Sequence, residues 1–139
     1  MAQETNKLKS DLAVRTYDHD PADATVATKV NWVAMTEAFM ALLTVIVGAV
    51  VTFKIFAATD DQGAGATVVK AHATPTTADA EGDQLVLEVS AEEVKAALEG
   101  ATHVSVEVDM VTNTDQAAVT YVRRGFRHGQ ADQTADVIA

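Results

Sequence analysis

The chain has 139 residues, no cysteine, and 20 acidic against 10 basic side chains, so its formal charge is −10. This length suits one small domain with accessory segments. The lack of cysteine excludes a disulfide framework, a thiolate metal site and a cysteine nucleophile. The negative charge argues against a general nucleic-acid binder, which carries a basic surface. Only seven residues are aromatic, so large side chains that could fill a core are scarce.

Residues 1–29 show no sustained apolar periodicity, and we expect them to form a polar N-terminal tail. The tail contains the cluster Tyr17-Asp18-His19-Asp20, whose oxygen and imidazole groups are of a kind that binds divalent cations. Its spacing matches no metal-binding loop. We therefore interpret the cluster as a charged surface and predict no metal site.

The bulky apolar residues are concentrated in residues 30–56, where the 16 residues from Ala38 to Phe53 carry no charge. As a helix with its flanks, this segment would be roughly 35–40 Å long, enough to cross a hydrocarbon layer of about 30 Å. The interruptions at Thr44, Gly48 and Thr52 lie four residues apart, a spacing that lets membrane helices pack closely. We therefore predict a single transmembrane helix over 30–56, with these three residues at a helix-packing face.

The ends of this segment favour the same interpretation. Glu37 and Lys54 have the favourable signs for the two ends of a helix dipole, and Lys54 is able to reach the lipid headgroups. Trp32 and Phe56 are placed for an interfacial belt. We predict that these four residues anchor the chain in a cell or virion membrane. The alternative, a buried helix in a soluble domain, would need a larger core than the rest of the chain supplies.

The charge is distributed unevenly, with −1 in residues 1–36, zero in 37–56 and −9 in 57–139. A long acidic C-terminal part is compatible with export, so we expect the N-terminus of this single-pass protein to lie inside. The acidic, lysine-poor composition resembles that of haloarchaeal proteins, in which high charge maintains solubility. The alternative is that the composition is that of an acidic protein encoded by any GC-rich genome.

The C-terminal part predicts a small α+β domain. Residues 57–83 read as a linker with turn-forming stretches, and Thr67–His72 is a candidate edge strand. Within the core module, residues 84–128, apolar and polar residues alternate in 84–89 and 103–110, and a third strand is expected over 117–126. Ser90 and Glu93 form a capping box that begins a helix over 91–99. The predicted fold is thus one transmembrane helix plus an antiparallel sheet with one helix, followed by a C-terminal arm, residues 129–139.

Two constellations in this domain are candidates for chemistry or binding. His103, Ser105, Glu107 and Asp109 share one face of a predicted strand, and we expect that face to be solvated. The basic cluster contains Arg123, Arg124 and Arg127 in an otherwise acidic domain. Such a patch is suited to contact an acidic partner chain or lipid phosphates.

A glutamate followed by a long apolar stretch and a small β domain resembles a type IV pilin. Glu37 is the fifth residue counted from Val33, and the resemblance implies that it pairs between subunits of a filament. Trp32 stands where that family has glycine, so the likeness departs from the pattern at the processing site.

The sequence contains no phosphate-binding glycine loop and no supported catalytic triad. We therefore expect no enzymatic activity, no cofactor and no nucleic-acid partner. The leading hypothesis is a structural or accessory subunit of a larger assembly, bound to a lipid bilayer and to other protein subunits. A virion or cell-envelope component of a halophile is one form of it. The alternatives are a type IV pilin-like filament subunit and an accessory subunit of a membrane respiratory complex.

Overall fold

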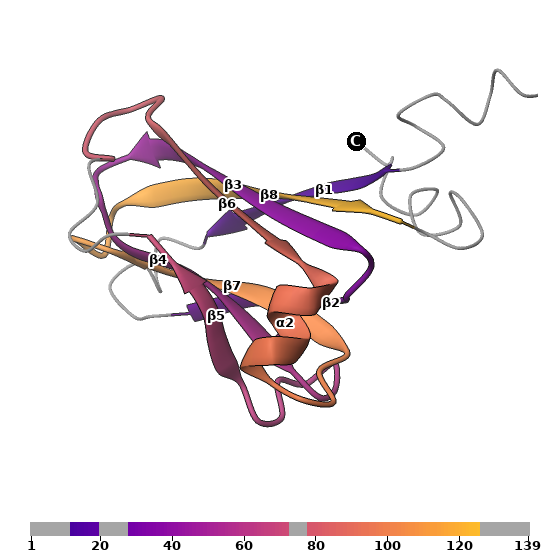
Figure 1. The fold of residues 1–139 in the computed structure, drawn as a ribbon. Coiled ribbons are helices and arrows are strands. Elements are labelled where there is room, and N and C mark those ends of the chain that lie inside the picture. The colour runs from indigo at the N-terminus through magenta and orange to yellow at the C-terminus, as the bar shows by residue number, and fades with distance from the viewer. Residues whose placement is uncertain (1–11, 20–27, 73–77, 126–139) are drawn as a thin grey trace, which may run out of the picture.

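The computed structural model describes residues 12–19, 28–72 and 78–125, which contain eight β-strands and one short helix (Figure 1). The elements in chain order are β1 (Leu12–His19), β2 (Thr28–Ala34), β3 (Ala38–Val47), β4 (Val50–Ala58), β5 (Thr67–Ala71), β6 (Gln84–Ser90), α2 (Ala91–Ala97), β7 (His103–Met110) and β8 (Gln116–Arg124).

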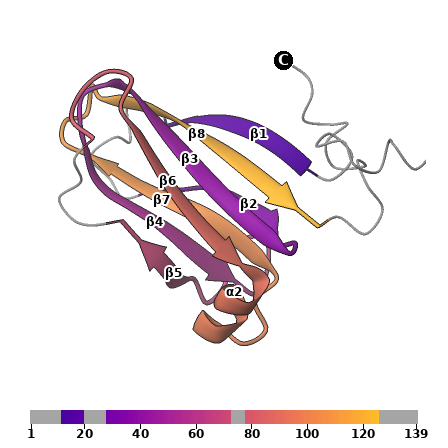
Figure 2. The same ribbon diagram turned by 45° about the horizontal axis from the view of Figure 1, so that its top comes forward.

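The strands form two antiparallel sheets, which lie one above the other in Figures 1 and 2. One sheet has the order β1-β8-β3-β6 and is called the β3 sheet below; the other has the order β2-β7-β4-β5 and is called the β4 sheet. Except between β4 and β5, each strand is followed by one in the opposite sheet. Eight strands connected in this way form a jelly roll, a β-sandwich in which both sheets contribute one face to the core.

The core lies between the two sheets and is filled mainly by valines, with a few larger side chains. Phe39 of β3 and Tyr121 of β8 meet edge to face, with ring centroids 4.9 Å apart. The Tyr121 hydroxyl then accepts a hydrogen bond from the backbone N–H of Val106 in β7, at 3.1 Å. Tyr121 therefore connects the β3 sheet to the β4 sheet through both apolar packing and a buried hydrogen bond.

The predicted transmembrane helix was wrong. Residues 38–47 and 50–58 form strands β3 and β4, the third strand in the order of each sheet. No helix within the described parts of the chain is long and apolar enough to cross a membrane. The membrane localisation and the bilayer partner, which depended on that helix, lose their support.

The long apolar run arises because two inner strands follow each other directly in the chain. Both strands carry apolar residues on their outer sides as well as in the core, for example Met40 and Leu42 on β3 and Phe56 on β4, so the run lacks a polar alternation. The two strands are separated at Gly48, where the backbone has φ +95° and turns from one sheet to the other. A Cβ atom at Gly48 would collide with the Asp115 carboxylate, so this corner requires glycine.

The predicted elements of the C-terminal part were largely correct, although they do not form a separate module. The helix Ala91–Ala97 begins with the capping box, since Ser90 Oγ accepts from the Glu93 N–H at 3.2 Å and Glu93 Oε1 accepts from the Ser90 N–H at 3.2 Å. However, β6 and β8 pair with β3, and β7 pairs with β4. The predicted α+β class was therefore wrong, because the supposed membrane segment supplies the central strands of one β-sandwich.

The N-terminal and C-terminal predictions have different outcomes. Strand β1, Leu12–His19, lies inside the segment expected to be a polar tail, and it pairs with β8 along its whole length. The candidate edge strand is confirmed as β5, Thr67–Ala71, at one edge of the β4 sheet. The predicted arm, residues 129–139, lies outside the described residues.

Candidate functional site

The outer face of the β3 sheet, which points away from the core, carries a continuous group of apolar side chains. Strand register places Val14, Val122 and Met40 in one row across β1, β8 and β3. The next row joins Leu42 of β3 to Val86 of β6. Directly opposed residues in antiparallel strands point to the same side of a sheet, so the five side chains adjoin one another. We call this group, Val14, Met40, Leu42, Val86 and Val122, the outer β3 face.

All five side chains of the outer β3 face are accessible to solvent. Val86 is 51% exposed and Val14 is 38% exposed, while the other three are half-buried between their neighbours. An exposed apolar group that is contiguous, rather than scattered, is typical of a binding surface. The polar residues Thr44, Gln84 and Thr120 border it on the same strands.

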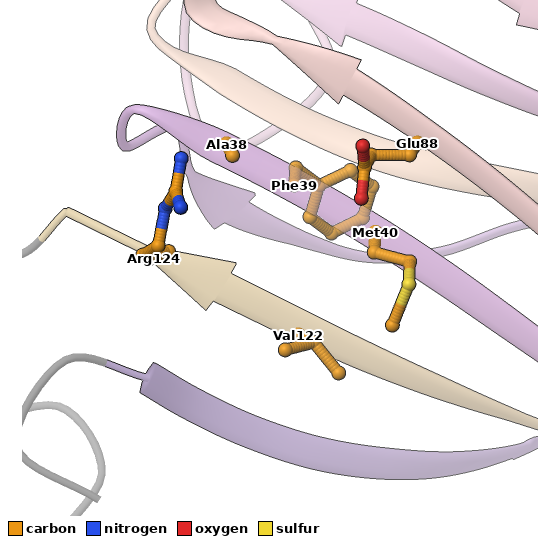
Figure 3. Close-up of a pocket in the computed structure, with 6 residues that line it drawn as sticks. All are labelled: Ala38, Phe39, Met40, Glu88, Val122 and Arg124. Atoms are coloured by element: carbon orange, nitrogen blue, oxygen red, sulfur yellow. The ribbon is translucent and has the colours of Figure 1, made fainter. Parts of the chain in front are cut away.

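A shallow depression of about 190 Å³ lies at one end of this face (Figure 3). It is lined by Ala38, Phe39, Met40, Glu88, Val122 and Arg124. Figure 3 shows the Arg124 guanidinium and the Glu88 carboxylate on different sides of it, with the β3 side chains between them. The depression therefore presents an apolar floor with one cation and one anion at its margins.

The charged side chains described at the margin of the outer β3 face, Arg124 and Glu88, have opposite signs. Both residues are exposed, and the ion pair found among the described residues, Lys70 with Glu93 at 3.7 Å, involves neither. Glu37 lies at the end of the face, where its backbone N–H donates to the Arg124 carbonyl oxygen at 3.0 Å. Its side chain occupies the space that a Cβ atom at Gly125 would need.

The outer face of the β4 sheet is different, because charged residues lie along it. Lys54 of β4 is opposite Glu107 of β7, and Thr52 is opposite Asp109. Ser105 and Glu107 are buried, so the prediction of a solvated polar row was wrong at these two positions. The charged residues Lys54, Glu107 and Asp109 make this face less apolar than the outer β3 face.

The Trp32 side chain contacts the β4–β5 loop. Strand β2 has a bulge between Val30 and Val33, and Asn31 in it has φ +37°. The Trp32 indole lies against Gly63 in the β4–β5 loop, so close that a Cβ atom at Gly63 would be 2.9 Å from Nε1. The indole thus joins the edge strand β2 to a loop that follows β4.

A metal site is not found in the part of the chain that the structure describes. Within those ranges, no three His, Asp or Glu side chains come together in a way that could hold an ion. His103 instead places Nδ1 2.8 Å from the Thr102 hydroxyl. The side chains of the Tyr17–Asp20 cluster lie outside the described residues.

The residues predicted to anchor or pack a membrane helix are dispersed in the β-sandwich. Thr44 lies on β3, Gly48 at the corner and Thr52 on β4, so they do not share one face. Lys54 lies on the outer face of the β4 sheet, whereas Phe56 is buried there opposite Ser105. Trp32 is on β2, and Glu37 lies between β2 and β3. The membrane-anchoring and helix-packing roles predicted for these residues required a transmembrane helix, so the structure gives them no support.

The basic cluster is divided by strand β8. Arg123 points inward, is 6% exposed, and donates from Nη1 to the Ala34 carbonyl oxygen at 3.1 Å. Arg124 is exposed on the other side of the strand, and Arg127 lies outside the described residues. A contact of Arg124 with a partner chain therefore stays a prediction, whereas Arg123 serves the connection between the two sheets.

Asp115 holds the corner between β3 and β4. Its carboxylate accepts from the Thr112 hydroxyl at 2.6 Å, the Thr112 N–H at 3.0 Å and the Ala49 N–H at 3.4 Å. Burial by itself raises the pKa of this carboxyl, but the hydrogen bonds outweigh burial and lower the pKa below its ordinary value of 3.8. The ionised group is therefore a structural link between the β3–β4 and β7–β8 connections.

Comparison with known proteins gives a weak similarity to solved structures. No protein-family model and no curated protein matches the chain. A structure of Bacillus endospore appendages, described as disulfide-linked pili, is 13% identical with a TM-score of 0.39, and the match covers 84% of this chain and 90% of that one. The infectious bursal disease virus VP2 subviral particle is 12% identical with a TM-score of 0.43, covering 83% of this chain and 34% of that one. The chain thus spans about a third of the viral chain, and the jelly-roll assignment rests on its own strand pairing.

Proposed function

We propose that this chain is a non-enzymatic structural subunit of a larger protein assembly, and that the outer β3 face binds the neighbouring protein chains. The observation that supports this proposal is the contiguous exposed group Val14, Met40, Leu42, Val86 and Val122 on a regular sheet. Covering such a group removes apolar surface from water, which is the main favourable contribution to protein association.

The composition of the face suits a protein partner. Its centre is apolar, while Thr44, Gln84, Glu88 and Arg124 lie around that centre. A dry apolar centre with a polar rim is the usual arrangement of a protein–protein interface.

A filament is the form of assembly that we put first, and a virion or cell-envelope shell of a halophile comes second. Either form needs a second contact surface on each chain besides the outer β3 face, because an open filament or a closed shell requires every subunit to meet more than one neighbour. The compared pilus and viral-particle structures are assemblies as well, but at their TM-scores they do not choose between the forms. The type IV pilin resemblance required a helix after Glu37, where the chain has strand β3, so the filament proposed is of no particular family.

Two matched valine variants test this proposal in the organism from which the chain comes. Val86 of β6 and Val68 of β5 both lie on edge strands, both point outward, and are 51% and 41% exposed. Val86→Glu places a charge on the outer β3 face, whereas Val68→Glu places it on the outer face of the other sheet.

We expect tagged wild-type chain and Val68→Glu to sediment from gently lysed cells as large particles, while Val86→Glu sediments as a small species. Negative-stain electron microscopy of the large fraction then shows whether it holds filaments or shells. Equal sedimentation of both variants with the wild type would overturn the proposal.

A further inference from the structure

We infer that the chain bound at the outer β3 face is a second copy of this same chain, packed face to face with the first. This inference rests on the proposed function and specifies the partner. Three properties of the described residues bear on it. The charge of the face relative to that of the whole chain and the presence of both signs at its margin favour a second copy, and the area of the face sets how strong the pair is.

The first property is electrostatic. Each copy carries a formal charge of −10, so two copies repel wherever acidic surfaces approach. The described charged side chains around the outer β3 face are Arg124 and Glu88 at its margin and Glu37 at its end. By contrast, the outer face of the β4 sheet has one cation, Lys54, against Asp109 and the buried Glu107. The β4–β5 loop adds the exposed Asp60 and Asp61. Among these surfaces, the outer β3 face is therefore the one on which two copies meet with the least repulsion.

The second property is self-complementarity. A two-fold interface uses the same surface on both copies, so each contact occurs twice. Arg124 on β8 and Glu88 on β6 flank β3 on its two sides. A two-fold axis in the interface near Met40 places Arg124 of one copy beside Glu88 of the other, and the reverse. Because both side chains are exposed, these two contacts mainly determine orientation, and the apolar centre supplies the affinity.

The third property is size. Four strands about 4.8 Å apart, covered over about 24 Å of their length, offer roughly 450 Å² on each copy and about 900 Å² in the pair. Stable interfaces bury about 1,200 Å² or more, so an isolated pair is expected to be weak, with a dissociation constant of about 10–100 μM. In a larger assembly, a second contact surface on each chain would link such pairs and raise the overall affinity.

A single introduced cysteine tests this geometry directly, because the chain has none of its own. A disulfide in such a variant can form only between two copies. Met40→Cys places the thiol next to the proposed axis, and Val68→Cys is the control on the other sheet. Under mild oxidation of the purified full-length chain, we expect Met40→Cys to form dimers at least about five-fold faster than Val68→Cys, as read on a non-reducing gel.

Charge reversal tests the reciprocal pair. Sedimentation velocity of the purified chain is compared for Arg124→Glu, Glu88→Arg and the double variant. Each single change places like charges opposite each other in both copies, and we expect it to raise the dissociation constant about 3–10-fold. The double change restores two attractive pairs, and we expect a dissociation constant within about two-fold of the wild type.

The results separate this inference from the function on which it rests. A purified chain that stays monomeric at about 1 mM, with equal oxidation rates for Met40→Cys and Val68→Cys, overturns the homotypic pairing. The proposed function would still stand if Val86→Glu alone lost its large particles in cells, and a partner of another kind would then occupy the face. A purified dimer unaffected by both the cysteine position and the charge reversals also overturns the inference.

Discussion

The two sheets of this β-sandwich contribute similar inner faces but have different outer faces. Inside, alternate residues of both sheets supply valines and a few larger side chains to one core. Outside, the β3 sheet exposes Met40, Leu42 and Val86, whereas the β4 sheet carries Lys54 and the buried Glu107. Since the core needs only one side of each strand, the other side is free to differ, and this difference is the basis of the contact we propose with other chains.

The largest expected effect is a loss of stability at Tyr121, in the core that the two sheets share. Tyr121→Ala removes the ring that packs on Phe39 and the hydroxyl that bonds the Val106 N–H. We expect a loss of about 3–5 kcal/mol in the free energy of unfolding, measured by urea denaturation. Thr120→Ala, one residue away on the outer side of β8, is the control and should cost less than about 1 kcal/mol. Similar losses for both would show that the inner and outer faces of β8 are not distinct.

A smaller effect is expected at the corner that separates β3 from β4. Gly48→Ala combines a positive φ with a collision against the Asp115 carboxylate, whereas Gly82→Ala, at φ +88°, meets open space. We expect Gly48→Ala to cost about 2–4 kcal/mol and Gly82→Ala about 1 kcal/mol, by thermal or urea unfolding. Equal costs would mean that the close approach of Asp115 does not constrain this corner.

The salt dependence of the dissociation constant tests whether charge repulsion opposes the pairing of two copies. Raising NaCl from about 0.1 to 1 M shortens the screening length from about 10 to 3 Å. Repulsion between copies of charge −10 should weaken, and we expect the dissociation constant of the purified dimer to fall about 3–10-fold in sedimentation velocity. Dissociation at high salt would mean instead that ion pairs, rather than the apolar centre, hold the copies together.

The smallest effect is the pH dependence that arises from Asp115. Its hydrogen bonds lower the pKa in the folded chain, so its contribution to stability is present above the ordinary value of 3.8 and is lost as pH falls through the folded value. We expect the stability advantage of the wild type over Asp115→Asn to be constant near neutral pH and to shrink below about pH 4 in urea titrations. An advantage unchanged down to pH 2 would argue against a lowered pKa.

The elements that could be predicted from the sequence are those with one polar face. Strands 84–90 and 103–110 could be predicted because their residues alternate in polarity. The start of the helix could be predicted because the Ser90–Glu93 capping box forms by local hydrogen bonds. Strands β3 and β4 could not be distinguished from a helix by periodicity, because apolar residues occupy both of their faces. Gly48 was interpreted as a helix-packing glycine, since its spacing from Thr44 and Thr52 does not reveal a corner.

The outer β3 face was missed for the same reason. Met40 and Leu42 lie inside the segment predicted to be a transmembrane helix, and in a helix they would not share a face that excludes Phe39 and Ala41. The strand expected over 117–126 did contain a usable signal, because adjacent residues of a strand point to opposite faces. That rule alone would have separated Arg123 from Arg124 and placed Val122 on the same side as Arg124.

The central claim is that the outer β3 face, and not the outer face of the β4 sheet, binds neighbouring chains. Sedimentation velocity of the purified Val86→Glu and Val68→Glu variants at equal concentrations tests it most directly. We predict that Val68→Glu keeps the wild-type dissociation constant, while Val86→Glu raises it at least about ten-fold with no loss of the folded state in circular dichroism. Weaker association of Val68→Glu, with Val86→Glu unchanged, would contradict the claim.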